Sequence, residues 1–279
     1  MIEEVVPVEV VRSFRNLAAR HLGLAIDKEW EPVVCARITK RLKQLQLPLH
    51  RYLYRLYQEK DAGEIVSFWD FVRPRPLALF APWSDYEQLH AHVLHRLASG
   101  QRRFRFWSAG CGSGEQAYAM ALTAEHAASV EGVETSSLDL KILATDLSAI
   151  AIASGKRGVF DRMQVQHVPQ DLRRRHFFRS SGGFAISDDI QSRVVFRVLN
   201  LAQPPFPMTR PFDAIFCHEG LAPLVPEART RALRATQDLL CKDGFLRAGF
   251  DIPLGSSGEP SQKLPDDRST SATTPPRYC

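Results

Sequence analysis

Apolar residues near the start of the chain recur with the spacing of amphipathic helices. Three segments, at residues 8–24, 31–47 and 49–59, place apolar side chains three or four positions apart, so that they share one helical face. The residues that carry this pattern are Val11, Phe14, Leu17, Ala18, Val34, Ile38, Leu42, Leu45, Leu53, Leu56 and Tyr57. No strand-like alternation interrupts them, and we expect a small all-helical region.

The pattern changes at about residue 103. Strand-like apolar segments at 103–110, 140–148, 194–206 and 211–220 alternate with helical segments at 115–128 and 149–160. A helix from residue 227, a Lys-Asp-Gly turn and a fifth strand follow. Because strands that alternate with helices form a doubly wound parallel sheet, the predicted fold class is α/β, with a Rossmann-like sheet preceded by a small all-helical domain.

The chain divides into four predicted regions. Residues 1–70 form a helical N-terminal domain, and 71–95 a proline-interrupted linker and connecting helix. Residues 96–253 hold the sheet, with a small insertion near 159–191 where the alternation breaks. The remaining 254–279 are rich in Ser, Pro and Thr and are expected to be disordered.

A glycine-rich corner joins the first predicted strand to its helix. Glycines at 110, 112 and 114 permit positive φ and carry no Cβ atom that would block a ligand. A dinucleotide would place its pyrophosphate at the helix N-terminus, where this chain has the carboxylate of Glu115. The charge therefore favours a cationic or polar ligand over a phosphate.

Asp146 ends the second predicted strand, where a carboxylate accepts hydrogen bonds from ribose hydroxyls. Two interpretations are open. One is a tight strand–helix corner with Glu115 and Asp146 exposed to solvent; the other is a site for a nucleoside-containing cofactor. The glycines alone do not decide between them, but the glycines together with Asp146 favour the cofactor.

Composition narrows the class of protein. The 279 residues are 44% hydrophobic, and the net charge of +5 is too small to indicate nucleic-acid binding without a clustered basic face. Five scattered cysteines without a CxxC pair indicate neither a zinc site nor a disulfide framework, which favours a reduced, cytoplasmic compartment. No apolar run approaches the roughly 20 residues that span a bilayer, so no membrane insertion is expected.

Four segments in order resemble the CheR-type methyltransferases: FWSAGCGSGEQAYAMAL, ILATDLSAIAIASGKRGVF, FRVLNLAQPPFPMTRPFDAIFC and LLCKDGFLRAGF. The helical segment RITKRLKQLQL is similar to that family's basic helix, and the likeness covers about residues 10–250. The resemblance implies a methyltransferase fold with S-adenosyl-L-methionine as cofactor and S-adenosyl-L-homocysteine as product. It also implies transfer of the methyl group to glutamates of bacterial chemoreceptors.

The resemblance assigns a cofactor-binding role to seven residues and a catalytic or metal-binding role to none. It implies that the corner lines the cofactor, that Glu115 meets the methionine amino group, that Asp146 holds the ribose, and that the segment after the third strand borders the adenine. The seven residues are Gly110, Cys111, Gly112, Glu115, Asp146, Asn200 and Leu201. The alternatives are a strand-end cap for Asn200 and backbone packing without thiol chemistry for Cys111.

This chain departs from the family pattern on both walls of the implied site. The departing residues are Arg75, Leu77, Ala81, His218, Glu219 and Pro223. Ala81 replaces an arginine that in the family pairs with the methionine carboxylate, a hydrogen bond that typically contributes about 1.5–3 kcal/mol. Arg73 or Arg75 is a candidate substitute for it. The adjacent His218 and Glu219 allow an acid–base interpretation or a simple loop pair.

Two functions remain open from the sequence. The first is an S-adenosylmethionine-dependent protein-glutamate O-methyltransferase, in which an ionised carboxylate nucleophile needs positioning and desolvation rather than a general base. The second is a catalytically impaired relative that binds a cofactor or a partner as a signalling module. The implied partner is the cytoplasmic domain of a chemoreceptor or a related signalling protein.

A basic segment offers a candidate surface for that partner. Arg37, Lys40, Arg41 and Lys43 form a basic cluster that could dock an acidic receptor helix, or could simply be a solvated helical face. Nonspecific nucleic-acid binding is a weaker third interpretation, because no aromatic side chains are interleaved with the basic residues as stacking platforms. No nucleic-acid partner is therefore expected.

Overall fold

The computed structural model describes residues 7–26, 31–58, 63–64, 66, 78–209 and 211–249. The helices and strands given below belong to one unit that extends from Met1 to Ala248. Arg73, Arg75, Leu77 and the predicted tail at 254–279 lie outside the described residues. The domain boundaries expected from the sequence stay a prediction.

The first part of the chain is helical, as its apolar period predicts. Helices α1 (Val8–Leu22), α2 (Glu31–Leu45) and α3 (Leu49–Gln58) bury much of the expected pattern, with Phe14, Ile38 and Leu56 each at most 3% exposed. In α3 the buried face also includes Tyr52, which the pattern did not assign to it, whereas Leu53 is only partly buried. The guanidinium of Arg41 contacts the buried carboxylate of Glu64 at 2.8 Å, and the Tyr52 hydroxyl donates to the same carboxylate at 2.7 Å.

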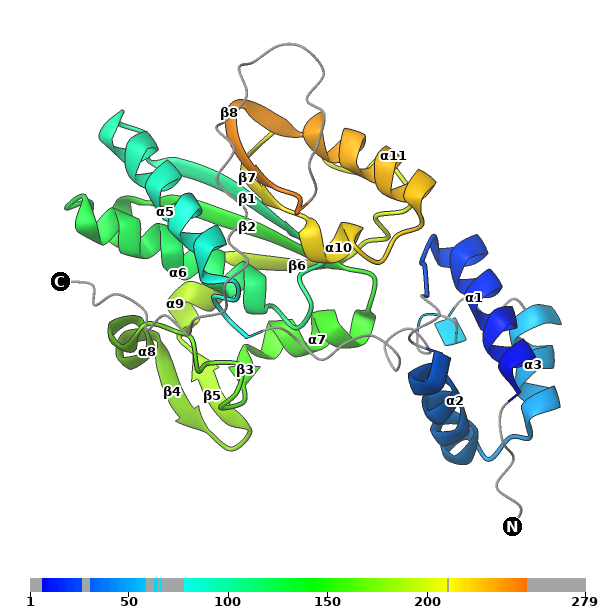
Figure 1. Ribbon diagram of the computed structural model, residues 1–279. Coiled ribbons are helices and arrows are strands. Elements are labelled where there is room, and N and C mark those ends of the chain that lie inside the picture. Colours follow the sequence, from blue (N-terminus) through cyan, green and yellow to red (C-terminus); the bar gives the residue numbers. More distant parts are fainter. Residues whose placement is uncertain are drawn as a thin grey trace, which may run out of the picture. The chain divides into compact units, whose positions relative to one another are not determined.

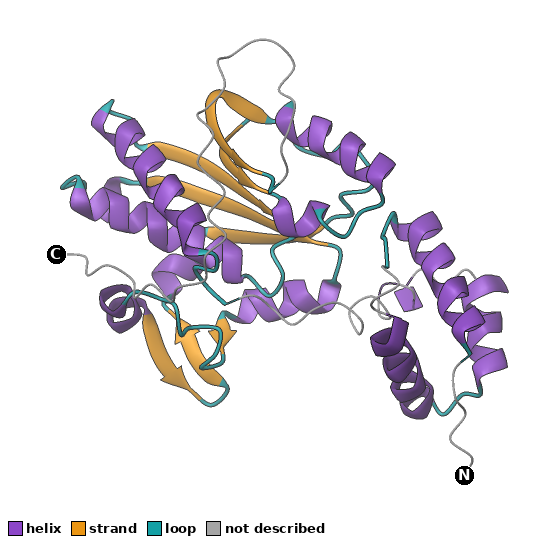
Figure 2. Ribbon diagram, viewed as in Figure 1, coloured by secondary structure: helices purple, strands orange, loops and turns teal. Residues whose placement is uncertain are grey.

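A five-stranded parallel sheet forms the centre of the second part (Figures 1 and 2). Its strand order is β6-β2-β1-β7-β8, and every neighbouring pair is parallel. The strands are β1 (Arg103–Ala109), β2 (Asp139–Asp146), β6 (Val194–Val198), β7 (Phe212–Phe216) and β8 (Leu240–Arg247). This sheet confirms the predicted Rossmann-like α/β class.

Helices and short turns connect these strands, as the alternating pattern predicts. They are α6 (Glu115–Val130), η2 (Thr135–Ser137), α7 (Ala149–Arg157), α10 (His218–Leu221) and α11 (Pro226–Gln237), and α5 (Trp83–Ala98) precedes β1. The strand expected at 211–220 is wrong at its end, because β7 stops at Phe216 and α10 begins at His218. No helix among the described residues is both long enough and apolar enough to cross a membrane.

The predicted insertion is a small antiparallel sheet with two short helices. Strands β3 (Val159–Phe160), β5 (Gly183–Ile186) and β4 (Phe177–Ser180) lie in that order. Helix α8 (Gln170–His176) precedes β4, and α9 (Asp188–Gln191) follows β5.

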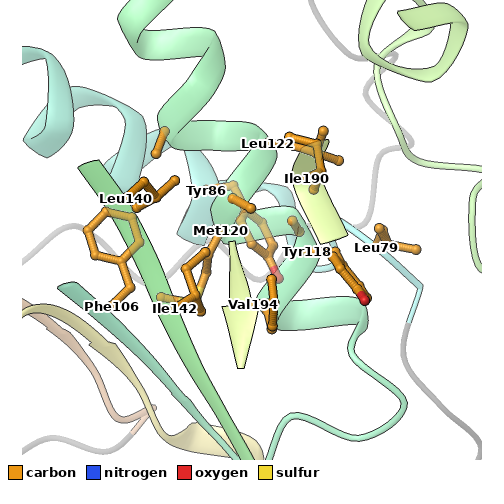
Figure 3. Packing of buried hydrophobic residues seen from close by; sticks show 14 of the residues in the cluster. Leu79, Tyr86, Phe106, Tyr118, Met120, Leu122, Leu140, Ile142, Ile190 and Val194 are labelled. Atoms are coloured by element: carbon orange, nitrogen blue, oxygen red, sulfur yellow. The ribbon is translucent and has the colours of Figure 1, made fainter. Parts of the chain in front are cut away.

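The core lies between the sheet and the helices α5 and α6. Phe104 and Phe106 of β1 are fully buried in one hydrophobic cluster with residues of α5, α6 and the insertion, part of which is drawn in Figure 3. Trp107 points to the other side of the strand and packs against Phe206 and Phe212, with ring centroids 5.4 and 5.6 Å away. Both sides of β1 are thus covered, so the strand is buried up to the corner that follows it.

Helices α5 and α6 meet at a pair of histidines. The Nε2 atom of His90 and the Nδ1 atom of His126 are 3.0 Å apart, and both side chains are partly buried. Burial lowers the pKa of both imidazoles, and the neighbouring His126 lowers that of His90 further. The unfolded chain therefore takes up protons at these positions more readily than the folded protein does.

This pair predicts a loss of stability in mild acid. Histidine in the unfolded chain has a pKa of about 6.5, and both histidines have a lower pKa in the folded protein. The free energy of unfolding should therefore decrease as the pH falls through about 6.5. The double variant His90→Gln, His126→Asn keeps polar atoms in the places of Nε2 and Nδ1 but cannot titrate. Urea unfolding at several pH values should show a flatter pH dependence for this variant than for the wild type; parallel curves would contradict the assignment.

Candidate functional site

The glycine corner between β1 and α6 is held by the end of β2. Gly110, Gly112 and Gly114 have φ values of +87°, +56° and +96°, the left-handed region that favours glycine. The backbone N–H groups of Gly110 and Cys111 both donate to the carbonyl oxygen of Thr145, at 2.7 and 2.9 Å. The corner is therefore fixed to the neighbouring strand.

Gly110 admits another part of the protein's own backbone. A Cβ atom at this position would lie 2.3 Å from the backbone nitrogen of Gly220 in α10. A Cβ atom on Gly220 would in turn lie 2.6 Å from the carbonyl oxygen of Ala109. The absence of both side chains lets the end of β1 and α10 approach closely, so the missing Cβ atom of Gly110 makes room for α10.

Asp146 joins the corner to the next helix. Its Oδ2 atom accepts a hydrogen bond from the backbone of Gly112 and its Oδ1 atom accepts one from Ser148, both at 2.9 Å. The Ser148 hydroxyl accepts a hydrogen bond from the backbone N–H of Ala151 and so caps α7. Asp146 is 7% exposed, and a carboxylate can accept more than two hydrogen bonds, so it both shapes the corner and keeps the chemistry of an acceptor.

Glu115, the first residue of α6, is 2% exposed. Its carboxylate accepts a hydrogen bond of 2.5 Å from the side-chain amide of Gln164. Gln164 is itself fixed. Its Oε1 atom accepts a hydrogen bond from the backbone of Asp161 and its backbone N–H donates to the Asp161 carboxylate, both at 2.8 Å. Its backbone carbonyl accepts a third hydrogen bond from the backbone of Leu79. The exposed acids that the alternative interpretation of the corner requires are not observed.

The remaining predicted residues lie at the same edge of the sheet. The backbone N–H of Leu199 donates to the carbonyl of Asp146, which places the segment after β6 beside that residue. The Asn200 side chain accepts a hydrogen bond from Ala202, as expected of a strand-end cap. Leu201 packs against Gly220, and Cys111 is 2% exposed. The structure therefore brings all seven predicted residues to the carboxyl ends of β1, β2 and β6.

A second group of polar residues, which the sequence did not predict, lies at the ends of β7 and β8. The Arg247 Nε atom is 2.7 Å from the Oδ1 atom of Asp85 in the first turn of α5. The ring of the adjacent Tyr86 is 5.6 Å from that of Phe216. Burial raises the pKa of Tyr86 far above its ordinary value, and the charges of Asp85, Glu219 and Glu115 raise it further. These three carboxylates are therefore near enough to Tyr86 to act on its hydroxyl electrostatically.

His218 and Glu219 form the contact that their sequence positions suggested. The His218 Nδ1 atom is 3.2 Å from the Oε1 atom of Glu219, and the two side chains are 42% and 36% exposed. The hydrogen bond to Glu219 raises the pKa of His218, with burial acting in the opposite direction. Burial raises the pKa of the preceding Cys217 to about 12, so its thiol stays protonated at neutral pH.

Two signals in the sequence could have revealed part of this second group. Arg247 is a charged residue at the end of an apolar strand, and Asp85 is an acid in the first turn of a helix. Asp161 and Gln164 have the three-residue spacing of a capping pair, but nothing in that spacing indicates the contact between Gln164 and Glu115.

The acceptor groups at this edge of the sheet indicate the class of ligand that the site suits. Glu115 and Asp146 supply carboxylates at the start of α6 and the end of β2, where a pyrophosphate would be repelled. Carboxylates accept hydrogen bonds from ammonium and hydroxyl groups. The described residues contain no cluster of acids, histidines or cysteines that could hold a metal ion. The residues present fit a nucleoside ligand that carries a cationic amine.

The close approach at Gly110 predicts a specific loss of stability. Gly110→Ala should be destabilised by about 1–2 kcal/mol for the left-handed backbone and by about 1–3 kcal/mol more for overpacking against Gly220. Gly100→Ala is the matched control, because Gly100 has a φ of +91° but no atom within 4 Å of its Cβ position. Urea unfolding should show the larger loss for Gly110→Ala; equal losses would mean that the α10 contact yields without cost.

Comparison with known proteins identifies the family. Residues 80–261 match the family described as "CheR methyltransferase, SAM binding domain". The chain is 25% identical to chemotaxis protein methyltransferase 2 of Pseudomonas aeruginosa, over 86% of this chain and 85% of that protein. It is 30% identical to the chemotaxis protein methyltransferase of Vibrio anguillarum, over 87% of this chain and 88% of that protein. The predicted cofactor, S-adenosylmethionine, is confirmed at the level of this domain, and the chain belongs to the CheR methyltransferase family.

Proposed function

We propose that this protein transfers the methyl group of S-adenosylmethionine to glutamate side chains of a chemoreceptor or a related signalling protein. The observation that carries the proposal is the pair of buried carboxylates, Glu115 and Asp146, on either side of a corner that Asp146 itself holds in shape. Membership of the CheR family supports the reaction class.

The chain's own residues would share the work of holding the reactants. Glu115, oriented by Gln164, would accept hydrogen bonds from the methionine ammonium, and Asp146 from the ribose hydroxyls. The backbone of Gly110, Cys111 and Gly112 would line the cofactor, and Asn200 and Leu201 would border the adenine. When bound, the cofactor supplies a methyl group on a positively charged sulfur.

Exclusion of water and correct positioning are what this site can contribute to catalysis. The glutamate of the acceptor is already ionised at neutral pH, so it can attack without a general base. Tyr86 and Phe216 are at most 4% exposed and pack against each other, with ring centroids 5.6 Å apart, which gives the site a dry apolar support. Desolvation of a carboxylate nucleophile and alignment with the methyl carbon would then account for the rate.

The basic residues of α2 are the proposed docking surface for an acidic receptor helix. Lys40 and Lys43 are exposed, and Arg37 is partly buried. Arg41 has a different position, because its guanidinium contacts the buried Glu64. Lys40 and Lys43 are therefore the residues on which the docking proposal is best tested.

Specific observations support a second candidate function, a cofactor-binding or partner-binding module with little turnover. Ala81 carries no charge, and Pro223 offers no side-chain hydroxyl. The Pro223 carbonyl accepts a hydrogen bond of 2.7 Å from Ala25, next to an antiparallel bridge between Leu24 and Leu224. If each lost positioning group contributed about 1.5–3 kcal/mol, two losses would slow transfer by several powers of ten.

One paired experiment separates the two functions. Calorimetric titration with S-adenosylhomocysteine measures cofactor binding, and transfer of a tritiated methyl group to a chemoreceptor cytoplasmic fragment measures turnover. Binding with transfer supports the methyltransferase, and binding without transfer supports the module. Absence of both would overturn the methyltransferase and the cofactor-binding module, and would leave only a scaffold that binds a partner.

Removal of the Glu115 charge should weaken cofactor binding. Glu115→Gln keeps the size of the side chain but replaces a charged acceptor, so the affinity for S-adenosylhomocysteine should fall by about tenfold to a hundredfold, or roughly 1.5–3 kcal/mol. Glu131→Gln is the control, because Glu131 is exposed at the other end of α6. Calorimetry that finds the same affinity for both variants would remove Glu115 from the site.

Charge reversal on α2 should act on the acceptor and not on the cofactor. The double variant Lys40→Glu, Lys43→Glu should raise the KM for the receptor fragment, with a weaker effect at high salt because screening reduces the interaction of exposed charges. The affinity for S-adenosylhomocysteine should stay unchanged. Lys242→Glu, an exposed lysine of β8, should leave the KM as it is; an equal effect there would indicate a general response to net charge.

A further inference from the structure

The ion pair between Arg247 and Asp85 joins a partly exposed guanidinium to a nearly buried carboxylate. The Asp85 side chain is 10% exposed, whereas that of Arg247 is 37% exposed. The Nε atom of Arg247 is buried, so the exposed area belongs to the rest of the side chain, which includes both terminal Nη groups. No described residue accepts a hydrogen bond from either Nη group. The buried carboxylate thus fixes one edge of a guanidinium whose other nitrogens have no partner among the described residues.

The contact between the two atoms is close but poorly formed. Nε and Oδ1 are 2.7 Å apart, yet neither atom has a hydrogen bond of acceptable geometry among the described residues. A buried polar group without a good hydrogen bond costs about 1–3 kcal/mol. A contact retained at such a cost is more readily explained by a role in binding than by stability alone.

Arg247 lies at the same edge of the sheet as the corner. Its carbonyl accepts a hydrogen bond of 2.9 Å from Cys217, the residue before α10, and Gly220 of α10 packs against Gly110. On the other side, Asp85 precedes Tyr86, whose hydroxyl lies near the carboxylates of Glu219 and Glu115. The guanidinium therefore belongs to the wall of the site that α5, β7 and β8 form.

The charges in this part of the site give Arg247 a distinct chemistry. Glu115, Asp146 and Glu219 all carry carboxylates, which repel a reactant carboxylate. The proposed reaction has two such reactants, because the methionine part of the cofactor and the acceptor glutamate each bear one. The planar guanidinium of arginine binds carboxylates through two parallel N–H donors, and Arg247 presents this group where position 81 supplies none.

We infer that Arg247, held in place by Asp85, binds a reactant carboxylate at this site, either that of the methionine moiety or that of the acceptor glutamate. This inference rests on the proposed function. Asp85 acts as a positioning residue, since it contacts Arg247 and not the reactant. The sequence alone offered Arg73 or Arg75 as a substitute guanidinium, and both lie outside the described residues.

The same two elements provide a matched control. Arg96 of α5 is 3.6 Å from Asp243 of β8 and also donates to Gln101. That pair joins α5 to β8 at the end of the sheet away from the corner, and its carboxylate is 70% exposed. Arg96→Gln therefore removes a guanidinium between the same elements without touching the site.

The first arm of the test addresses the cofactor carboxylate. Calorimetry compares the wild type, Arg247→Gln, Arg247→Lys and Arg96→Gln with S-adenosylhomocysteine and with its decarboxylated analogue. If Arg247 binds the methionine carboxylate, Arg247→Gln should lower the affinity for S-adenosylhomocysteine by about tenfold or more. The affinity for the decarboxylated analogue should stay unchanged. Arg247→Lys should restore part of the affinity, since it keeps the charge but not the fork of donors.

The second arm addresses the acceptor carboxylate and does not depend on the cofactor. Nitrogen-15 NMR of the arginine side chains follows a titration with N-acetyl-glutamate amide, with N-acetyl-glutamine amide as the neutral control. The Arg247 signals, assigned by their absence in Arg247→Lys, should shift with the glutamate compound alone if Arg247 binds the acceptor. Asp85→Asn should reduce that shift because the guanidinium is no longer held.

The outcomes separate this inference from the proposed function. An effect in either arm that is absent in Arg96→Gln supports carboxylate binding and assigns its source. No carboxylate-dependent effect in either arm, or an equal effect in Arg96→Gln, overturns it. If the wild type does not bind S-adenosylhomocysteine, the proposed cofactor site fails, while the NMR arm still decides whether Arg247 binds a carboxylate.

Discussion

The shape of the site depends on one carbonyl and one carboxylate at the end of β2. The Thr145 carbonyl accepts hydrogen bonds from two residues of the corner, and the Asp146 carboxylate accepts one from the corner and one from the start of the next helical segment. Four backbone N–H groups in sharply turning chain are satisfied in this way. Because a buried N–H without a partner costs about 1–3 kcal/mol, the corner cannot relax without breaking its connection to β2. Asp146 therefore has a structural reason to be a carboxylate whether or not a ribose is bound.

The sequence predicts the elements well because they depend on local periods. Alternation and helical spacing are properties of neighbouring residues, so the strands of the large sheet, its longer helices and the break at the insertion could be located from the chain alone. The short α10 was missed, because the pattern continued a strand to residue 220, and the elements inside the insertion were not assigned. The family resemblance also indicated which residues would gather at the corner. The contacts within the site were harder, because they join residues far apart in the chain. Gln164 reaches Glu115 from the insertion, and Asp85 reaches Arg247 across the helix–sheet interface.

Gly110 shows that one sequence pattern can have a second cause. A glycine without a side chain at a strand–helix corner is typical of a ligand site, and the sequence was interpreted in that way. The structure fills the space beside Gly110 with the backbone of Gly220. No local pattern distinguishes a glycine that admits a ligand from one that admits another segment, because both require only the absence of Cβ. The role of Gly110 becomes clear only from its contact with Gly220, which lies 110 positions later in the chain.

The reciprocal glycines have a consequence for how this site can diverge. A methyl group on Gly110 would displace the backbone of Gly220, and one on Gly220 would displace the backbone of Ala109. Both positions therefore hold the end of β1 close to α10. The distance between the end of β1 and α10 can then change little without a loss of stability. Selectivity for a new acceptor must arise from exchange of side chains around a fixed frame, and positions such as His218, Glu219 and Arg247 are where a change of specificity can begin.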